Sequence, residues 1–142
     1  MKIAIASDHA GYPLKAMVAE WLISQFTNVK DYGTFNEQSV DYPDFAHVVA
    51  GEVESGNFDM GVLICGTGIG VDITANKHQG IRSALCWHKD IARLAKSHNN
   101  ANIICLPGRF INFEEAKEIL TTFFNTSFEG GRHQNRIDKI SC

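Results

Sequence analysis

The segment LICGTGIG, residues 63 to 70, places a thiol directly before a loop rich in glycine. Cys65 ends an apolar run, and three glycines then alternate with other residues. Because glycine carries no side chain, other groups can approach this backbone closely and its N–H groups stay accessible. Three functions fit such a segment: a phosphate cradle, a redox thiol or a catalytic base.

The spacing of these residues weakens the first two functions. GTGIG lacks the GxGxxG spacing of dinucleotide-binding loops and the lysine–serine pair of a P-loop. A redox thiol needs a second cysteine close in sequence, and none accompanies Cys65. A thiol base beside accessible N–H groups and Thr67 suits removal of a proton alpha to a carbonyl, because such donors stabilise the resulting oxyanion.

Cys65 has a structural alternative as well as a chemical one. A free cysteine in the middle of a strand is usually a small buried hydrophobe. Cys65 is instead expected at a strand end that faces the start of a helix, where N–H groups favour a thiolate. We therefore expect an exposed and reactive thiol at this position.

Other polar residues follow other apolar runs. Asp8 and His9 follow the first run, and Arg109 follows the last. Asp8 could equally cap the first helix, and His9 could be an ordinary surface imidazole. Near the end of the chain, Arg132 and Arg136 lie four positions apart, which suits a two-armed grip on a phosphate if the segment is helical. A solvated basic face is the alternative for this pair.

The elements that must position these residues alternate along the chain. Short, almost continuously apolar runs fit strands buried on both faces, and the amphipathic runs between them fit helices. We expect strands over residues 2–7, 29–33, 60–65, 81–86 and 102–107. We expect helices over residues 12–26, 44–56, 70–77, 88–99 and 112–124, with a further short helical pattern in the polar tail that begins at residue 128.

This alternation predicts an open, parallel, five-stranded sheet covered by helices on both faces. The result is a three-layer α/β/α fold in a single domain over residues 1–142, with a C-terminal tail. In such sheets, ligands bind outside the carboxyl ends of the strands, where the strand order reverses. Asp8, His9, Cys65 and Arg109 should therefore meet at one edge.

Composition limits the partners and the setting. The net charge is −3, and no basic block interleaved with aromatic residues indicates a nucleic-acid surface. No apolar run approaches the ~20 residues that cross a bilayer, so we expect a cytoplasmic protein without membrane contact. The four cysteines form no CxxC pair and no zinc spacing, which predicts reduced thiols and no structural metal.

Several short motifs together resemble those of one family. They are SDHAG at 7–11, DYP at 41–43, CGTGIG at 65–70, ANK at 75–77, HN at 98–99 and EGGRHQNR at 129–136. They are similar to the motifs of type B ribose-5-phosphate isomerases, a group that includes galactose-6-phosphate isomerase. The resemblance implies a Rossmann-like fold, a homodimer or dimer of dimers, and no cofactor. It also implies metal-free interconversion of ribose 5-phosphate and ribulose 5-phosphate, a step of the pentose phosphate pathway.

The resemblance further implies residue roles. Cys65 corresponds to the base that moves a proton between C1 and C2, with Thr67 beside it, and His98 to the group that assists ring opening. The amides of residues 66 to 70 would steady the enediolate. The other matched positions bind the substrate or lie near the pocket: Asp8, His9, Tyr42, Gly66, Gly68, Ile69, Gly70, Asn99, Arg109, Arg132, His133 and Arg136.

The sequence departs from the family pattern at a few positions. Asn100 stands where Asp is common, Pro107 where Gly is common, and Asp72 where a small residue is usual. Some relatives replace the thiol by a carboxylate directly after the loop, where this chain has Val71. Cys65 is thus the only candidate base in the loop. The preference among ribose, allose and galactose phosphates stays open. So does a rival class with the same fold and no isomerase activity: a sugar-phosphate-binding protein or regulator, or a redox module.

His98 should not lie at the same edge as Cys65. It ends the fourth helix, which returns to the opposite edge before the fifth strand begins, roughly a strand length or ~17–20 Å away. If both residues act on one sugar, the simplest arrangement brings His98 from a second chain and gives two shared sites in a twofold dimer. The alternative is that His98 only stabilises the end of its helix.

Overall fold

A computed structural model describes residues 1–142 and contains a single sheet of five strands. The strands are β1 (Lys2–Ser7), β2 (Asn28–Asp31), β3 (Met60–Cys65), β4 (Ser83–Leu85) and β5 (Ile103–Pro107). They lie in the order β2-β1-β3-β5-β4, and every pair is parallel. The chain passes from β1 to β2 on one side and then to β3 on the other, so the strand order reverses between β1 and β3.

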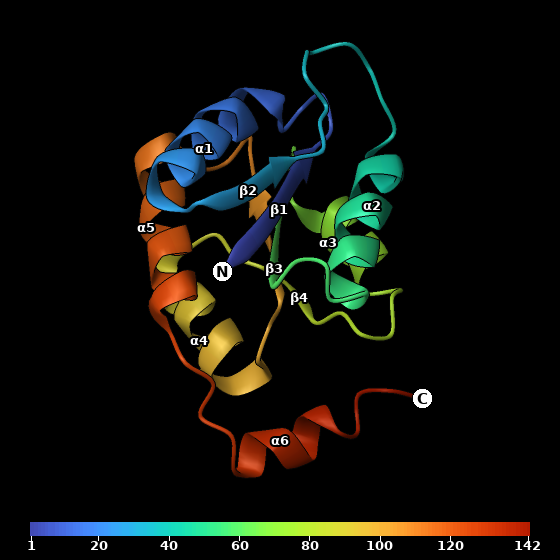
Figure 1. Ribbon diagram of the computed structural model, residues 1–142, viewed down its shortest axis with the longest axis vertical. Helices are drawn as coiled ribbons and strands as arrows, with labels where there is room; N and C mark the ends of the chain where they lie inside the picture. The colour runs from blue at the N-terminus through green and yellow to red at the C-terminus, as the bar shows by residue number, and fades with distance from the viewer.

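Five helices cover the sheet and a sixth lies beyond it (Figure 1). They are α1 (Tyr12–Gln25), α2 (Tyr42–Glu54), α3 (Ile69–Ala75), α4 (Lys89–Asn99), α5 (Phe113–Asn125) and α6 (Arg132–Ile137). Helices α1, α4 and α5 pack on one face of the sheet, and α2 and α3 pack on the other. The predicted three-layer α/β/α fold is confirmed.

Alternation along the strands divides the core into two clusters. In β3, Val62 packs with the residues of α1, α4 and α5, whereas Leu63 packs with those of α2 and α3, and both are fully buried. Burying such a side chain contributes roughly 1.5–3 kcal/mol to the free energy of folding. On the second face, Gly61 lets α2 approach closely, because an added side chain would come within 2.7 Å of Val49.

The predicted elements match the structure closely except at the two edge strands. β1 and β3 have the predicted bounds, and each of the five predicted helices begins and ends within two residues of its predicted range. β4 has three residues instead of six, because at the sheet edge it pairs only with β5 and its residues are only partly buried. β2 ends two residues early at the other edge. None of the helices combines the length and apolarity that crossing a bilayer requires.

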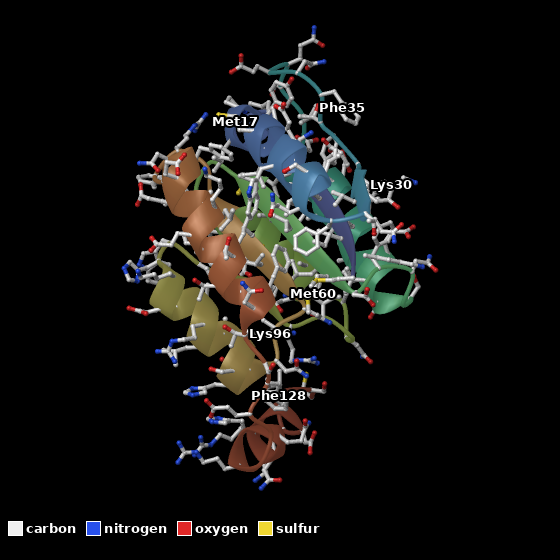
Figure 2. All side chains as sticks on the ribbon, turned by 60° about the vertical axis from the view of Figure 1, so that its left-hand side comes forward. Met17, Lys30, Phe35, Met60, Lys96 and Phe128 are labelled. Atoms are coloured by element: carbon white, nitrogen blue, oxygen red, sulfur yellow. The ribbon has the colours of Figure 1, made fainter.

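The tail leaves the body after α5 and forms α6 beneath the end of α4. The N–H of Glu129 donates to the carbonyl of Ser97 in α4 at 3.0 Å, which ties the tail to the body. Gly130 and Gly131 then take positive φ values of 67° and 56°, which glycine adopts without strain, and turn the chain into α6. Phe128 marks the junction between the body and α6 (Figure 2).

Candidate active site

Backbone hydrogen bonds hold the carboxyl ends of three strands together. The N–H of Asp8, directly after β1, donates to the carbonyl of Ile64 in β3 at 3.3 Å. After β5, the N–H of Gly108 donates to the carbonyl of Cys65 at 2.8 Å, and the N–H of Arg109 donates to the carbonyl of Gly66 at 3.0 Å. The edge at which the sequence predicts a site therefore carries an acid, a thiol and a guanidinium group.

Cys65 lies at the centre of this edge. Its side chain is 4% exposed and belongs to the core cluster of α2 and α3. The N–H of Gly68 donates to its Sγ at 3.2 Å, which fixes the position of the sulfur. The prediction of an exposed thiol is wrong, because the glycine loop folds back over the strand end and buries the side chain.

The loop requires glycine at its turn into α3. Gly68 has a φ of 75°, and an added Cβ would lie 2.4 Å from the side chain of Leu85 and 3.0 Å from the backbone of Leu106. Only glycine fits this space and this conformation. Directly before it, Thr67 is exposed and its Oγ1 accepts a hydrogen bond from the N–H of Ile69 at 3.2 Å. The loop thus presents a hydroxyl group next to the buried sulfur.

Asp8 and His9 are both held in place by backbone groups. The Oδ1 of Asp8 accepts a hydrogen bond from the N–H of Gly11 at 2.9 Å, and its Oδ2 makes no hydrogen bond within the chain. Asp8 itself is not the N-cap of α1, since Gly11 holds that position. The Nδ1 of His9 accepts a hydrogen bond from the N–H of Val40 at 3.1 Å, which leaves Nε2 to donate. One oxygen and one N–H remain available to a ligand.

Two further predicted residues lie against the glycine loop. A Cβ added at Gly66 would lie 3.3 Å from the Cδ and Nη1 atoms of Arg109. A Cβ added at Gly70 would lie 2.7 Å from the ring of Tyr42. Glycine at these positions therefore admits the guanidinium group and the phenol ring, which come from the same chain as Cys65.

The other buried thiols are held in their protonated form. Burial raises the pKa of Cys86 to about 12 and raises the pKa of Cys105 well above its ordinary value, and the carboxyl of Asp72 adds to both shifts. Asp72 accepts a hydrogen bond from the hydroxyl of Ser83 at 2.7 Å, and burial raises its own pKa. The contacts of Ser83 with Asp72 and Cys105 join α3 to the edge of the sheet. Cys86 and Cys105 are protonated at neutral pH, and a protonated thiol cannot act as a base.

A second group of predicted residues lies where α4 meets α6. His98, Asn99, His133 and Arg136, with Ile137 and Ile140, line a cavity of about 320 Å³. The rings of His98 and His133 are stacked, with their centroids 4.1 Å apart and 14° between their planes. Arg132 is exposed at the start of α6, and Asn100 ends α4 with a φ of 46°, a conformation that asparagine tolerates well.

The sheet separates the two groups. Cys65 is in register with Pro107, the last residue of β5, whereas His98 precedes Ile103, its first residue. At ~3.3 Å per residue, the length of β5 between these ends is about 13 Å. The prediction that His98 and Cys65 lie at opposite edges of the sheet is confirmed. Within one chain, the two side chains are too far apart to contact the same small molecule.

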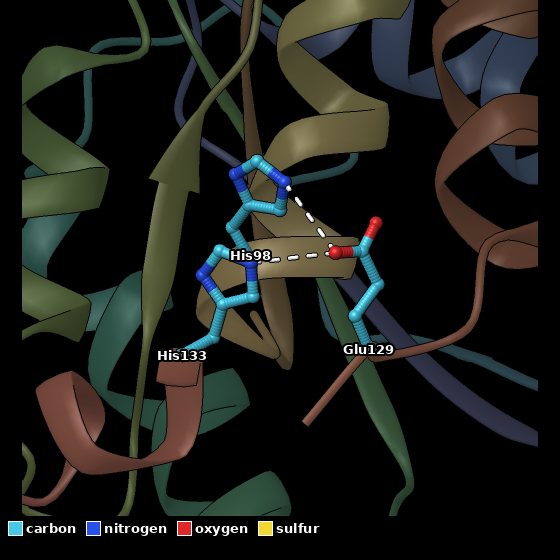
Figure 3. A group of neighbouring side chains, drawn as sticks. All are labelled: His98, Glu129 and His133. Carbon is cyan, nitrogen blue, oxygen red and sulfur yellow. Dashed lines mark ion pairs between the residues drawn. The ribbon is translucent and has the colours of Figure 1, made fainter. Parts of the chain in front are cut away.

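Sequence reasoning missed Glu129. Its Oε2 lies 3.8 Å from the Nε2 of His98 and 3.3 Å from the Nε2 of His133 (Figure 3). The spacing of four residues between Glu129 and His133 was a usable signal. The contact with His98 was not, because it depends on how the tail returns to α4.

Comparison with known proteins agrees with this geometry. The sequence model of the ribose/galactose isomerase family matches residues 3–140. The chain belongs to this family. The resemblance drawn from the short motifs is therefore confirmed, and it covers almost the whole chain rather than the glycine loop alone.

Individual relatives are similar over the same length. A ribose 5-phosphate isomerase from Thermotoga maritima matches with a TM-score of 0.96 and 55% identity over 98% of this chain and 96% of that one. Ribose-5-phosphate isomerase B from Mycoplasma genitalium, solved with bound ribulose-5-phosphate, matches with a TM-score of 0.93 and 47% identity. The match covers 98% of this chain and 93% of that one. Ribose-5-phosphate isomerase B of Escherichia coli K12 is 40% identical over 141 residues, covering 99% of this chain and 95% of the relative.

Proposed function

We propose that this chain interconverts ribose 5-phosphate and ribulose 5-phosphate. The observation that carries the proposal is the sulfur of Cys65, held at 3.2 Å from the N–H of Gly68 inside a loop bordered by Arg109 and Tyr42. Family membership supports it, as do relatives with this activity in their names, one of them with ribulose-5-phosphate bound. The step would belong to the pentose phosphate pathway, in the cytoplasm.

The reaction moves one proton between neighbouring carbons. The thiolate of Cys65 removes the proton from C2 of the aldose, the electron pair forms the C1–C2 double bond, and negative charge passes to the carbonyl oxygen at C1. The hydroxyl proton of O2 then passes to O1, the electron pair left on O2 forms the carbonyl at C2, and the proton held by Cys65 is returned to C1, which gives the ketose. The N–H groups of Gly68 and Ile69 bond to the Cys65 sulfur and the Thr67 oxygen. The Thr67 hydroxyl and the remaining N–H groups of the loop would stabilise the developing charge, and the proposed step uses no metal ion.

A second set of residues prepares and holds the sugar. Sugar phosphates are mainly cyclic, and an imidazole such as His98 can move the proton that opens the hemiacetal. Arg132 and Arg136 would bind the phosphate, with Asn99 and His133 near them. Asp8 and His9 would take sugar hydroxyls, because each keeps one hydrogen-bonding atom free at the edge occupied by Cys65.

The separation of the two groups supports a shared active site. About 13 Å of strand lies between the ends of β5, and the two groups lie beyond opposite ends. We infer that the chain forms a homodimer, alone or as half of a dimer of dimers. In it, the glycine loop of one protomer faces the end of α4 and α6 of its partner. A twofold axis then creates two equivalent sites.

A direct assay tests the proposal. Purified protein is incubated with ribose 5-phosphate in the presence and absence of a metal chelator, and ribulose 5-phosphate is measured. We expect equal turnover in both. Loss of activity on chelation would refute the metal-free step, and lack of turnover on ribose, allose and galactose phosphates together would favour a binding protein. The ratio of kcat/KM among the three sugar phosphates identifies the preferred substrate.

A further inference from the structure

We propose that His98, Glu129 and His133 form a binding site for a divalent transition-metal ion of the Zn²⁺ type, and that an ion bound there inhibits the enzyme. Each of the three residues offers one ligand atom, and these atoms lie within 4.8 Å of one another. Two imidazoles and one carboxylate are a common ligand set for zinc with an open fourth position.

The distances suit a small ion. Ligand bonds of ~2.0–2.2 Å in a tetrahedron place neighbouring ligand atoms ~3.3 Å apart. The Nε2 of His133 is 3.3 Å from the Oε2 of Glu129, and the Nε2 of His98 is 3.8 Å from the same oxygen. Both nitrogens point toward this carboxylate in Figure 3. An imidazole binds an ion in the plane of its ring, so one of the two stacked rings must rotate before both nitrogens reach the same ion. His98, which is 36% exposed, has the room to do so.

The fold holds these ligands together without help from an ion. The backbone N–H of Glu129 is bonded to Ser97, the neighbour of His98, at 3.0 Å. His133 follows Glu129 by four residues across the turn at Gly130, and its side chain is 7% exposed, which restricts its motion. His98 and Glu129 are 36% and 56% exposed, so they keep the freedom to adjust and leave one side of the site open.

A second imidazole pair on the surface lacks this convergence. His78 uses Nε2 toward His47 at 2.8 Å and Nδ1 toward Glu54 at 2.9 Å. These groups form a line in which the central ring faces its partners in opposite directions. They therefore provide a matched control with the same residue types and similar contacts but no common focus.

The inhibition rests on the proposed function. An ion on the Nε2 of His98 removes the nitrogen that would move the ring-opening proton. It also occupies the cavity that His98 shares with Arg136, one of the proposed phosphate ligands. The positive charge of Arg136 lowers the affinity for a cation, so we expect an ion that binds reversibly and competes with substrate.

Metal binding is tested apart from activity. Zn²⁺ is titrated into chelator-treated protein by calorimetry, and Co²⁺ is added as a spectroscopic probe of tetrahedral coordination. All samples carry Cys142→Ser to remove the exposed thiol. We expect one ion per chain. Glu129→Gln should weaken binding by at least ~10–100-fold, the loss typical even of groups that only orient a ligand. His78→Gln should leave binding unchanged.

Equal binding by the Glu129→Gln protein, or loss of binding in His78→Gln, would overturn the site. The inhibition is then measured with ribose 5-phosphate at several Zn²⁺ concentrations. With ribose 5-phosphate well below its KM, we expect half-inhibition near the dissociation constant from calorimetry, and resistance in Glu129→Gln by the factor by which its binding falls. Equal inhibition of both proteins would place the inhibiting ion elsewhere and refute the regulatory part. Absence of any isomerase activity would refute the proposed function and leave the binding result standing.

Discussion

The glycine-loop edge and the α4–α6 edge differ in how the fold holds them. At the first, Cys65 is almost fully buried at the end of β3, and backbone hydrogen bonds tie this strand end to the residues that follow β1 and β5. At the second, His98 is partly exposed, and Arg132 and Arg136 lie on a six-residue helix joined to the body by a short tail. Under the proposed function, the chemical step would take place at the end of the sheet, and the phosphate would be bound by a short helix outside it.

This difference has a consequence for assembly. A rigid edge is complete in one chain, whereas a helix that extends beyond the layers gains order when it packs on another surface. The comparison predicts that changes at the first edge act on the chemical step, and that changes at the second act on substrate binding and on pairing of chains.

The largest expected effect is that of Cys65→Ala. Loss of a general base lowers kcat by ~10²–10⁴-fold or more, and the fold should survive because the side chain removed is small. The measurement is kcat with ribose 5-phosphate, alongside the circular dichroism spectrum. Cys86→Ala, which alters a buried thiol in the other core cluster, is the control and should retain its kcat. Near-normal turnover in Cys65→Ala would remove this residue from the mechanism.

The cysteines should differ greatly in their rates of reaction with a thiol-labelling reagent. The pKa of Cys86 is raised by burial from 9.0 to about 12. A raised pKa means less thiolate at any pH below it, so at pH 8 the folded protein holds ~1000-fold less Cys86 thiolate than the unfolded chain. Mass spectrometry after iodoacetamide treatment should show Cys142 labelled rapidly and Cys86 and Cys105 unlabelled until urea is added.

Labelling also tests the position of Cys65. Its modification should be slow, because the side chain is buried, and should remove activity. Ribulose 5-phosphate should protect it. If activity falls without label on Cys65, or if bound sugar gives no protection, the reactive site is elsewhere.

Arg136→Ala should mainly raise KM for ribose 5-phosphate. A hydrogen bond to a charged group contributes ~1.5–3 kcal/mol, which corresponds to ~10–100-fold in KM. Turnover of unphosphorylated ribose should change little. Arg93→Ala, an exposed arginine on α4 that does not line the cavity, is the matched control. Equal losses with both sugars would make Arg136 a structural residue.

The smallest effect is expected for Gly130→Ala in the tail. Gly130 has a φ of 67° with no atom within 4 Å of an added Cβ, so the cost is conformational and not steric. The left-handed conformation costs alanine ~1–2 kcal/mol, so the substitution should raise KM for ribose 5-phosphate by at most ~5–30-fold. Gly56→Ala, with a φ of 79° and equally open surroundings far from both edges, should lower the Tm without changing KM. The same change in KM in both variants would show that the tail does not orient α6.

The sequence was sufficient to predict the layers and the first edge. Short, almost continuously apolar runs located β1 and β3 to the residue, and parallel strands necessarily bring Asp8, Cys65 and Arg109 to one edge. The burial of Cys65 was not predictable, because it depends on a loop that folds back through the positive φ of Gly68. Edge strand β4 was overestimated, since apolar composition does not reveal that only β5 pairs with it.

The second edge was predictable only in part. Helical spacing placed Arg132 and Arg136 on α6, and helix direction placed His98 away from Cys65. The stacking of His98 on His133 and the contact with Glu129 depend on the path of residues 126–131. That path is set by one hydrogen bond to Ser97 and by two glycines, and such tertiary contacts leave no periodic signal in a sequence.

Mixing two inactive variants tests the shared active site most directly. Cys65→Ala and His98→Ala chains are unfolded, mixed in equal amounts and refolded, and subunit exchange is verified by native mass spectrometry. A mixed dimer holds one site with both defects and one intact site. A random mixture of equally stable chains should therefore recover about a quarter of wild-type activity. A mixture as inactive as either parent, with exchange verified, would contradict the shared site and require both residues to act within one chain.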